Sequence, residues 1–248
     1  MRHIQIFPDP ESLAHGAAAR FQESAAKAIA QRGVFTVALS GGSTPRLTYS
    51  LLAAEPYRSQ IEWAKIHFFW GDERCVPPDH PDSNYRMASE ALLSHVPVAP
   101  DHVHRMQGEN PDAAGAAAAY ASEIRAVFGA VDLPKFDLVL LGLGPDGHTL
   151  SLFPGSSALA EHQDLVIANW VEKFKTWRIT MTARLVNHAA SILFQVEGED
   201  KASPLREVLY GAYDPGKYPA QLIRPAEGEC YWFVDQRAAA LLPALNEP

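Results

Sequence analysis

Cysteine is scarce in this sequence, and a long hydrophobic segment is absent. Only two of the 248 residues are cysteines, Cys75 and Cys230. They are too few to form a zinc site of the CxxC type by themselves. No stretch approaches the roughly 20 apolar residues that cross a bilayer. The segment MRHIQIFPDPES, interrupted by prolines and acids, lacks the form of a signal peptide. We therefore expect a cytoplasmic protein with no membrane partner.

Positive charge is also in short supply. Lysine and arginine together number 21, against 29 aspartates and glutamates, which gives a formal net charge of −8. Generic nucleic-acid binding relies on clustered Lys and Arg, so no nucleic-acid partner is expected. A few local cations and backbone amides can still hold one phosphate group, so the composition is compatible with a small anionic ligand.

The chain alternates apolar runs with segments of helical spacing. The runs predict strands at His3–Phe7, Val34–Leu39, Ile66–Trp70, Phe136–Leu141, Ser191–Val196 and Cys230–Val234. Helices are predicted at Ser12–Ala30, Ser83–Ser94, Glu109–Phe128, Ala202–Tyr210 and Gln236–Leu245, and another near Pro45 with Thr44 as its cap. Strands separated by helices predict a three-layer α/β/α fold with a mostly parallel, Rossmann-like sheet. Because no repeat or linker is visible, we expect one domain over residues 1–248.

Ligands of open parallel sheets bind beyond the carboxyl ends of the strands, where three polar or glycine-rich loops stand out here. In the first, Ser40–Pro45, the adjacent Gly41 and Gly42 permit a tight turn close to a ligand. Ser43 and Thr44 supply hydroxyl groups, and the following helix offers free amides and its positive dipole end. The loop is as compatible with an ordinary strand-to-helix turn as with a phosphate cradle. It is not a Walker A motif, because no Gly-Lys-Ser/Thr follows.

The second loop is Gly71–Arg74, which the run at 82–86 extends. Arginine's planar fork suits phosphate or carboxylate oxygens, so Arg74 and Arg86 are candidate ligand contacts together with Asp72. For any one of these residues taken singly, a solvated loop in which neighbouring charges pair is the favoured interpretation.

The third loop, Gly142–Pro154, contains the histidine with the best catalytic context. His148 follows a predicted strand and has glycines nearby, so that its ring can approach a ligand. An unperturbed imidazole titrates near pH 6.5 and can accept a proton at neutral pH. Asp146, two residues earlier, is placed to orient that ring.

Two cations lie further along the chain. Arg178 belongs to the extended segment WRITMT, and Lys201 follows the strand at Ser191–Val196, where a lysine can reach a phosphate as a point charge. By pattern alone, a surface cation is the favoured interpretation of each. The His, Asp and Cys residues show no metal-ligand spacing, so we expect no metal and no other cofactor.

Five segments together resemble the 6-phosphogluconolactonases of the glucosamine/galactosamine-6-phosphate isomerase superfamily. They are ALSGGSTP (38–45), FFWGDERCVPPDHPDSNYRMA (68–88), FDLVLLGLGPDGHTLSLFPGS (136–156), RITMT (178–182) and GEDKA (198–202). They follow the family's order and spacing over nearly the whole chain. One position departs from the pattern: Trp177 precedes Arg178, where a smaller residue or a proline-containing segment is expected. The resemblance implies the glucosamine-6-phosphate deaminase/ribose-5-phosphate isomerase fold. It also implies a phosphosugar lactone as substrate, and we expect a monomer or a weak homodimer.

Glucosamine-6-phosphate deaminases are the main alternative, because they share the SGGSTP loop, an Asp-Glu pair and a Gly-x-Asp-Gly-His loop. In deaminases the histidine loop continues toward an asparagine and a glutamate. Here Thr149-Leu150-Ser151-Leu152-Phe153 follows, and no carboxylate occurs before Glu161. This favours the lactonase over a deaminase that would use Asp72 as its base. A non-catalytic sugar-phosphate sensor on the same fold is a third alternative, and the intact His148 loop weighs against it.

The resemblance implies hydrolysis of 6-phospho-D-glucono-1,5-lactone to 6-phosphogluconate, the second step of the oxidative pentose phosphate pathway. His148 would act as general base, Asp146 would position its loop, and Arg74 or backbone amides would stabilise the oxyanion. The residues expected to bind the substrate or its phosphate are Gly41, Gly42, Ser43, Thr44, Asp72, Arg86, Arg178 and Lys201.

Overall fold

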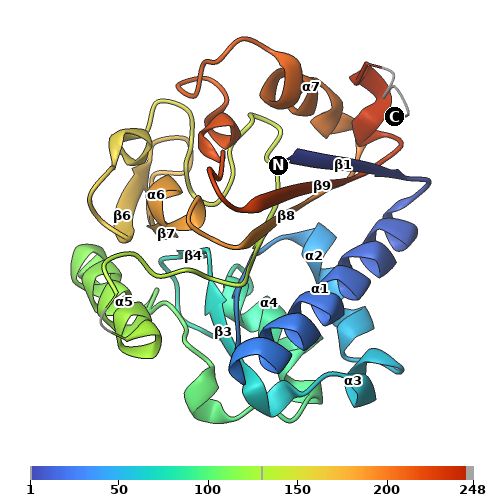
Figure 1. Ribbon diagram of the computed structural model, residues 1–248. Helices are drawn as coiled ribbons and strands as arrows, with labels where there is room; N and C mark the ends of the chain where they lie inside the picture. Colours follow the sequence, from blue (N-terminus) through green and yellow to red (C-terminus); the bar gives the residue numbers. More distant parts are fainter. Residues whose placement is uncertain (1, 130, 244–248) are drawn as a thin grey trace.

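A six-stranded parallel sheet forms the centre of the computed structural model, which describes residues 2–129 and 131–243 (Figure 1). Its order is β1-β9-β8-β5-β2-β3, and every neighbouring pair is parallel. The strands are β1 (Arg2–Phe7), β2 (Phe35–Leu39), β3 (Ile66–Trp70), β5 (Leu138–Leu141), β8 (Ser191–Val196) and β9 (Glu229–Asp235). All six were predicted, with ends within two residues, and the mostly parallel α/β fold is confirmed.

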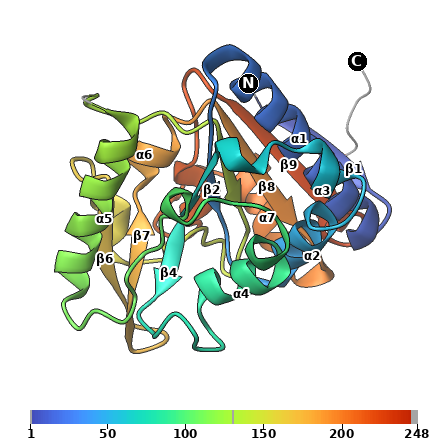
Figure 2. The same ribbon diagram turned by 90° about the horizontal axis from the view of Figure 1, so that it is seen from below.

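Helices cover both faces of this sheet, each over its own hydrophobic core (Figure 2). On one face lie α1 (Pro10–Arg32), α2 (Ser43–Leu52), α3 (Tyr57–Gln60) and α4 (Asn84–Ala91). On the other lie α5 (Ala113–Phe128), α6 (Ala183–Val186) and α7 (Ala202–Tyr210). Along β2, Phe35, Val37 and Leu39 belong to the first core and Ala38 to the second, as the alternation of side chains along a strand requires. Among the described residues, no helix is both long enough and apolar enough to cross a membrane.

A second, antiparallel sheet lies on the α5 side and was predicted only in part. Its order is β4 (Asp72–Arg74), β7 (Thr176–Met181) and β6 (Val166–Val171). The extended character of WRITMT indicated β7. By contrast, β4 has only three residues, and β6 mixes buried and half-exposed positions. The small sheet joins the main one through the Met181 amide, which donates to the Gly71 carbonyl at 2.8 Å.

Local capping interactions explain where several helices begin. Asp9 accepts a hydrogen bond from the Ser12 amide at 2.7 Å, so α1 begins two residues before the predicted Ser12. Asp112 caps α5 in the same way, and this helix therefore starts at Ala113 rather than at Glu109.

Two helix predictions were wrong. Thr44 does not cap α2: Gly42 occupies the cap position with φ +105°, and no side chain bonds there. In place of a helix over Gln236–Leu245 there is one short 3₁₀ turn at Ala238–Leu241, and residues 244 and 245 lie outside the described part of the chain.

The strand order places the predicted ligand loops beside each other. From β2 the chain moves outward to β3, whereas from β5 it moves the other way to β8. The neighbouring strands β2 and β5 therefore flank a topological switch point, where open parallel sheets leave a crevice at their carboxyl ends. Ser40–Pro45 follows β2 and the His148 loop follows β5, so both loops border this crevice.

Candidate active site

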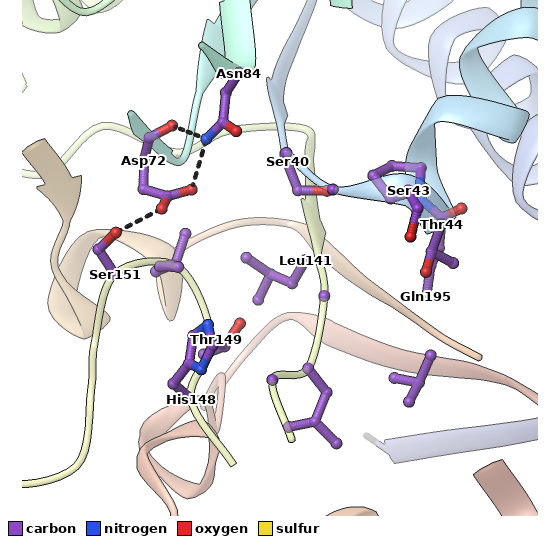
Figure 3. Close-up of a pocket in the computed structure, with 18 of the residues that line it drawn as sticks. Ser40, Ser43, Thr44, Asp72, Asn84, Leu141, His148, Thr149, Ser151 and Gln195 are labelled. Carbon is purple, nitrogen blue, oxygen red and sulfur yellow. Dashed lines mark hydrogen bonds between the residues drawn. The ribbon is translucent and has the colours of Figure 1, made fainter. Parts of the chain in front are cut away.

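A cavity of about 310 Å³ lies at this switch point (Figure 3). Nine of the eleven residues predicted for the site line it, namely Gly41, Gly42, Ser43, Thr44, Asp72, Arg74, His148, Arg178 and Lys201. Further lining residues include Asn84, Thr149, Ser151, Phe153, Phe174 and Gln195. The fold therefore gathers into one cavity side chains that are up to 160 positions apart, from residue 41 to residue 201.

The Ser40–Pro45 loop is held open to the cavity by contacts behind it. The hydroxyl of the buried Tyr49 on α2 donates to the Ser40 carbonyl at 2.9 Å and accepts from the Ser40 amide at 3.0 Å. A Cβ atom at Gly41 would overlap the side chain of Asn84, so only glycine fits there. Because no side chain caps α2, the amides of its first turn are not occupied by a capping group. These features favour the phosphate cradle over an ordinary turn.

Glu73 organises the second loop from a buried position. Its carboxylate accepts hydrogen bonds from the amides of Arg74, Asn84 and Tyr85 at 2.7–2.8 Å and from the Ser83 hydroxyl at 3.1 Å. Burial raises the pKa of Glu73, although these amide donors act to lower it. The carboxylate thereby ties β4 to the start of α4.

Asp72, beside Glu73, is oriented into the cavity by two donors. Ser151 donates to its Oδ2 at 2.6 Å, and the Asn84 amide donates to its Oδ1 at 3.3 Å and to its backbone carbonyl at 2.8 Å (Figure 3). Both carboxylate oxygens are therefore engaged within the protein. In this arrangement Asp72 is suited to accept hydrogen bonds from ligand hydroxyl groups through its remaining lone pairs.

His148 is held by a carboxylate and an aromatic ring. Its Nδ1 bonds Asp146 Oδ1, and its ring stacks on Phe153 with centroids 4.1 Å apart. A Cβ atom at Gly144 would overlap the imidazole, so this glycine makes room for the ring. Because an ionised carboxylate only accepts, Nδ1 carries the proton of this bond, and in the neutral form of the ring Nε2 has a free lone pair.

Asp146 does not line the cavity but lies behind His148, with 26% of its side chain exposed. Burial acts to raise its pKa, but the hydrogen bond and charge of His148 and a bond from Lys173 Nζ at 3.0 Å outweigh burial and lower it. The carboxylate therefore stays ionised and can stabilise an imidazolium beside it.

Two arginines face each other across the small sheet at the cavity. Arg74 on β4 is in register with Arg178 on β7. The Nε and Nη1 atoms of Arg178 are buried and form no hydrogen bond within the described part of the chain. Burial and then the charge of Arg74 lower the pKa of Arg178. An anion bound here would relieve both the missing hydrogen bonds and the repulsion.

The two remaining cations differ in position. Lys201 lines the cavity and is paired with Asp200. Arg86 does not line the cavity. Its Nε bonds Glu90 at 2.7 Å on the same helix, and its Nη1 donates to the Asp79 carbonyl at 2.8 Å. The prediction that Arg86 contacts substrate therefore has no support in the geometry.

Sequence reasoning missed several cavity residues. Ser151 and Asn84 were part of the quoted motifs but had no role assigned to them. Gln195 is 1% exposed at the end of β8, its Oε1 accepts from Thr48 at 2.6 Å, and its Nε2 has no partner among the described residues. An amide in an otherwise apolar buried strand was the available signal. Within residues 2–129 and 131–243, no three His, Cys, Asp or Glu side chains come together as a metal site would need.

Comparisons with known proteins agree with this architecture. Residues 8–232 match the family model described as Glucosamine-6-phosphate isomerases/6-phosphogluconolactonase. A 6-phosphogluconolactonase of Synechocystis sp. is 45% identical over 214 residues, which is 86% of each chain. A 6-phosphogluconolactonase of Nostoc sp. is 38% identical over 96% of this chain and 98% of its own.

Solved structures give the same picture. The 6-phosphogluconolactonase of Trypanosoma brucei superimposes with a TM-score of 0.87 at 30% identity, covering 98% of this chain and 99% of its own. A monomeric glucosamine-6-phosphate deaminase has a TM-score of 0.81 at 20% identity, over 96% of this chain and 99% of its own, and shares the fold.

The parallel sheet, its glycine loops and the cationic cavity at the switch point define an α/β enzyme of the sugar-phosphate type. Within that class, the chain belongs to the glucosamine-6-phosphate isomerase/6-phosphogluconolactonase family, and it is a hydrolase of the 6-phosphogluconolactonase type.

Proposed function

We propose that the protein hydrolyses 6-phospho-D-glucono-1,5-lactone to 6-phosphogluconate in the pentose phosphate pathway, with His148 as general base and no metal ion. The observation that carries the base assignment is the geometry of His148. Its Nδ1 is bonded to an ionised carboxylate, and its Nε2 makes no hydrogen bond within the described part of the chain, at a cavity that also contains the buried guanidinium of Arg178. Similarity to lactonases over nearly the whole chain supports the substrate.

The proposed reaction needs one base, one water molecule and an oxyanion stabiliser, because a lactone is already an activated ester. Nε2 of His148 takes a proton from water as its oxygen bonds to the lactone carbonyl carbon. The resulting oxyanion is stabilised by Arg74 or by backbone amides of the glycine loops. When the ring C–O bond breaks, the imidazolium returns the proton to the leaving ring oxygen. Asp146 stabilises that imidazolium between the two transfers.

The phosphate is assigned to the Ser40–Pro45 loop together with Arg178 and Lys201. The amides and hydroxyls at the start of α2 supply donors, and the two side chains supply charge. Holding this remote group fixes the lactone carbonyl against the base, so that binding energy distant from the broken bond assists the chemistry. The buried Nε and Nη1 atoms of Arg178, which have no hydrogen-bond partner among the described residues, support its part in this set.

Removing either phosphate cation should weaken substrate binding more than chemistry. We expect Lys201→Ala and Arg178→Met each to raise KM about 10- to 100-fold, which corresponds to the loss of roughly 1.5–3 kcal/mol for a charge-assisted hydrogen bond. Steady-state kinetics, corrected for spontaneous hydrolysis, measure this effect. Arg86→Met is the matched control, because Arg86 lies outside the cavity, and its KM should stay at the wild-type value. An unchanged KM in both cavity variants would contradict the phosphate assignment.

The substrate assignment is tested directly with the purified protein. We expect the protein to release acid from the lactone and to keep this activity after dialysis against a chelator. We expect no release of ammonia from glucosamine 6-phosphate. In the deaminase alternative, Asp72 would be the base that abstracts a proton. Ammonia release without lactone hydrolysis would replace this proposal with the deaminase alternative.

A further inference from the structure

The tip of the hairpin between β6 and β7, residues 172–175, reaches the His148 loop from a different part of the sequence. Two consecutive residues of this hairpin tip make the contact. Lys173 Nζ lies 3.0 Å from Asp146 Oδ2. Phe174, the next residue, lines the cavity. Neither side chain serves the core, because Lys173 is 56% exposed at its side chain and Phe174 is 49% exposed. Their contacts to the site thus call for a reason other than packing.

The first contact completes a chain of charges. Asp146 uses one oxygen for the imidazole of His148 and the other for the ammonium of Lys173. A carboxylate held at both oxygens cannot rotate, so the direction of its bond to Nδ1 is fixed. The ammonium also offsets part of the negative charge that the imidazole experiences.

The second contact acts on the plane of the ring. Phe153 stacks on His148 at 4.1 Å, and Phe174 packs edge-on against Phe153 at 5.7 Å with an interplanar angle of 81°. Lys173 also lies 5.4 Å from the centroid of Phe174. The hairpin tip therefore braces the imidazole twice, through its hydrogen-bond partner and through its stacking partner.

We propose that Lys173 is a positioning residue for the catalytic histidine, acting through Asp146 to fix the orientation of His148 and to keep its imidazole from becoming too basic. This proposal rests on the assignment of His148 as the base. Without the ammonium, Asp146 would attract a proton to the imidazole more strongly, and a larger share of the enzyme would be in the protonated, inactive form at a given pH.

Other charged or titratable groups near the ring are Asp72, Arg74, Arg178, Glu197, Lys201 and Tyr218. Within residues 2–129 and 131–243, none of them makes a hydrogen bond or ion pair with His148 or with Asp146. Lys173 is therefore the cation with a direct contact to the Asp146–His148 pair in this part of the chain.

The test is the pH profile of kcat for Lys173→Met, which keeps the length of the side chain and removes its charge. The acid limb should move to higher pH by roughly 0.5–1 unit, so kcat at pH values well below the midpoint of that limb should fall about 3- to 10-fold. Lys173→Arg should restore the wild-type limb. The matched control is Lys175→Met on the same hairpin tip, since Lys175 pairs with Glu172 and lies outside the cavity. This control should leave the profile unchanged.

An NMR titration of the His148 imidazole separates this proposal from the proposed function. The imidazole should titrate at higher pH in Lys173→Met than in the wild type, whether or not His148 is the base. Identical titration curves and identical pH profiles in the two proteins would overturn the positioning role. A shifted titration combined with full activity of His148→Asn would instead retain the Lys173 link and reject the base assignment.

Discussion

Replacing His148 with asparagine is expected to lower kcat for the lactone by about 10²- to 10⁴-fold, the contribution typical of a general base. Asparagine retains a donor near Asp146 but has no lone pair that accepts a proton at neutral pH. KM should change little, because the proposed phosphate contacts come from other loops. The measurement is initial-rate kinetics near pH 6.5, where slow spontaneous hydrolysis leaves the enzymatic rate visible.

A loss of kcat in His148→Asn supports the base assignment only if the variant remains folded. His148 is 23% exposed at its side chain and belongs to neither hydrophobic core, so a melting temperature within a few degrees of the wild type is expected. Asp146→Asn is a useful companion: it weakens the orienting bond without removing the base, and should lower kcat less than His148→Asn does. Turnover near the wild-type value in folded His148→Asn would eliminate His148 as the base.

The second large effect is on stability. Glu73→Gln should lower the free energy of unfolding by about 2–4 kcal/mol, because one of the two oxygens becomes an NH₂ group that faces donors. At roughly 2–4 °C per kcal/mol for a chain of this size, the melting temperature should fall by about 5–15 °C. Activity should fall as well, since Glu73 holds the backbone that carries Asp72, Arg74 and Asn84.

Thermal unfolding followed by circular dichroism measures this change. Glu62→Gln is the matched control, because the side chain of Glu62 is 58% exposed and pairs with Lys65 at 2.6 Å on the surface. The control should alter the melting temperature by no more than about 2 °C, as exposed ion pairs contribute little. Equal melting temperatures for Glu73→Gln and Glu62→Gln would mean that the buried hydrogen bonds of Glu73 do not hold the loop.

Much of the fold could be predicted because the strands β2, β3, β5 and β8 of the large sheet are compact apolar runs that end at a glycine or polar cluster. Ile66–Trp70 and Ser191–Val196 were predicted residue for residue. The small antiparallel sheet could not be predicted as easily. Its strand β4 has three polar residues and forms because β7, about a hundred positions later, pairs with it. Such pairing is a property of the assembled fold and leaves no periodic signal in the sequence.

The candidate site likewise contains residues that could be predicted from the sequence and residues that could not. Gly41, His148 and Lys201 lie at strand ends, and loops at the carboxyl ends of parallel strands converge whatever their sequence. Arg86 also follows a strand, but it sits one helical turn from Glu90 and pairs with it. Lys173 could not be found from sequence, because only the course of a hairpin brings it to Asp146. The partner of a charged side chain and the course of a long hairpin both depend on the three-dimensional structure.

The neighbouring positions of β2 and β5 also determine when this site comes into existence during folding. Thr36 and Asp137, which bond across these strands, are 101 residues apart in the chain. The Ser40–Pro45 loop therefore completes its synthesis long before the loop that carries His148. Closing so long a segment is costly in chain entropy until the contacts around it have formed, so the two loops meet only late in folding. Catalytic competence and the finished core should consequently emerge together on the ribosome or during refolding, with no active partial fold preceding them.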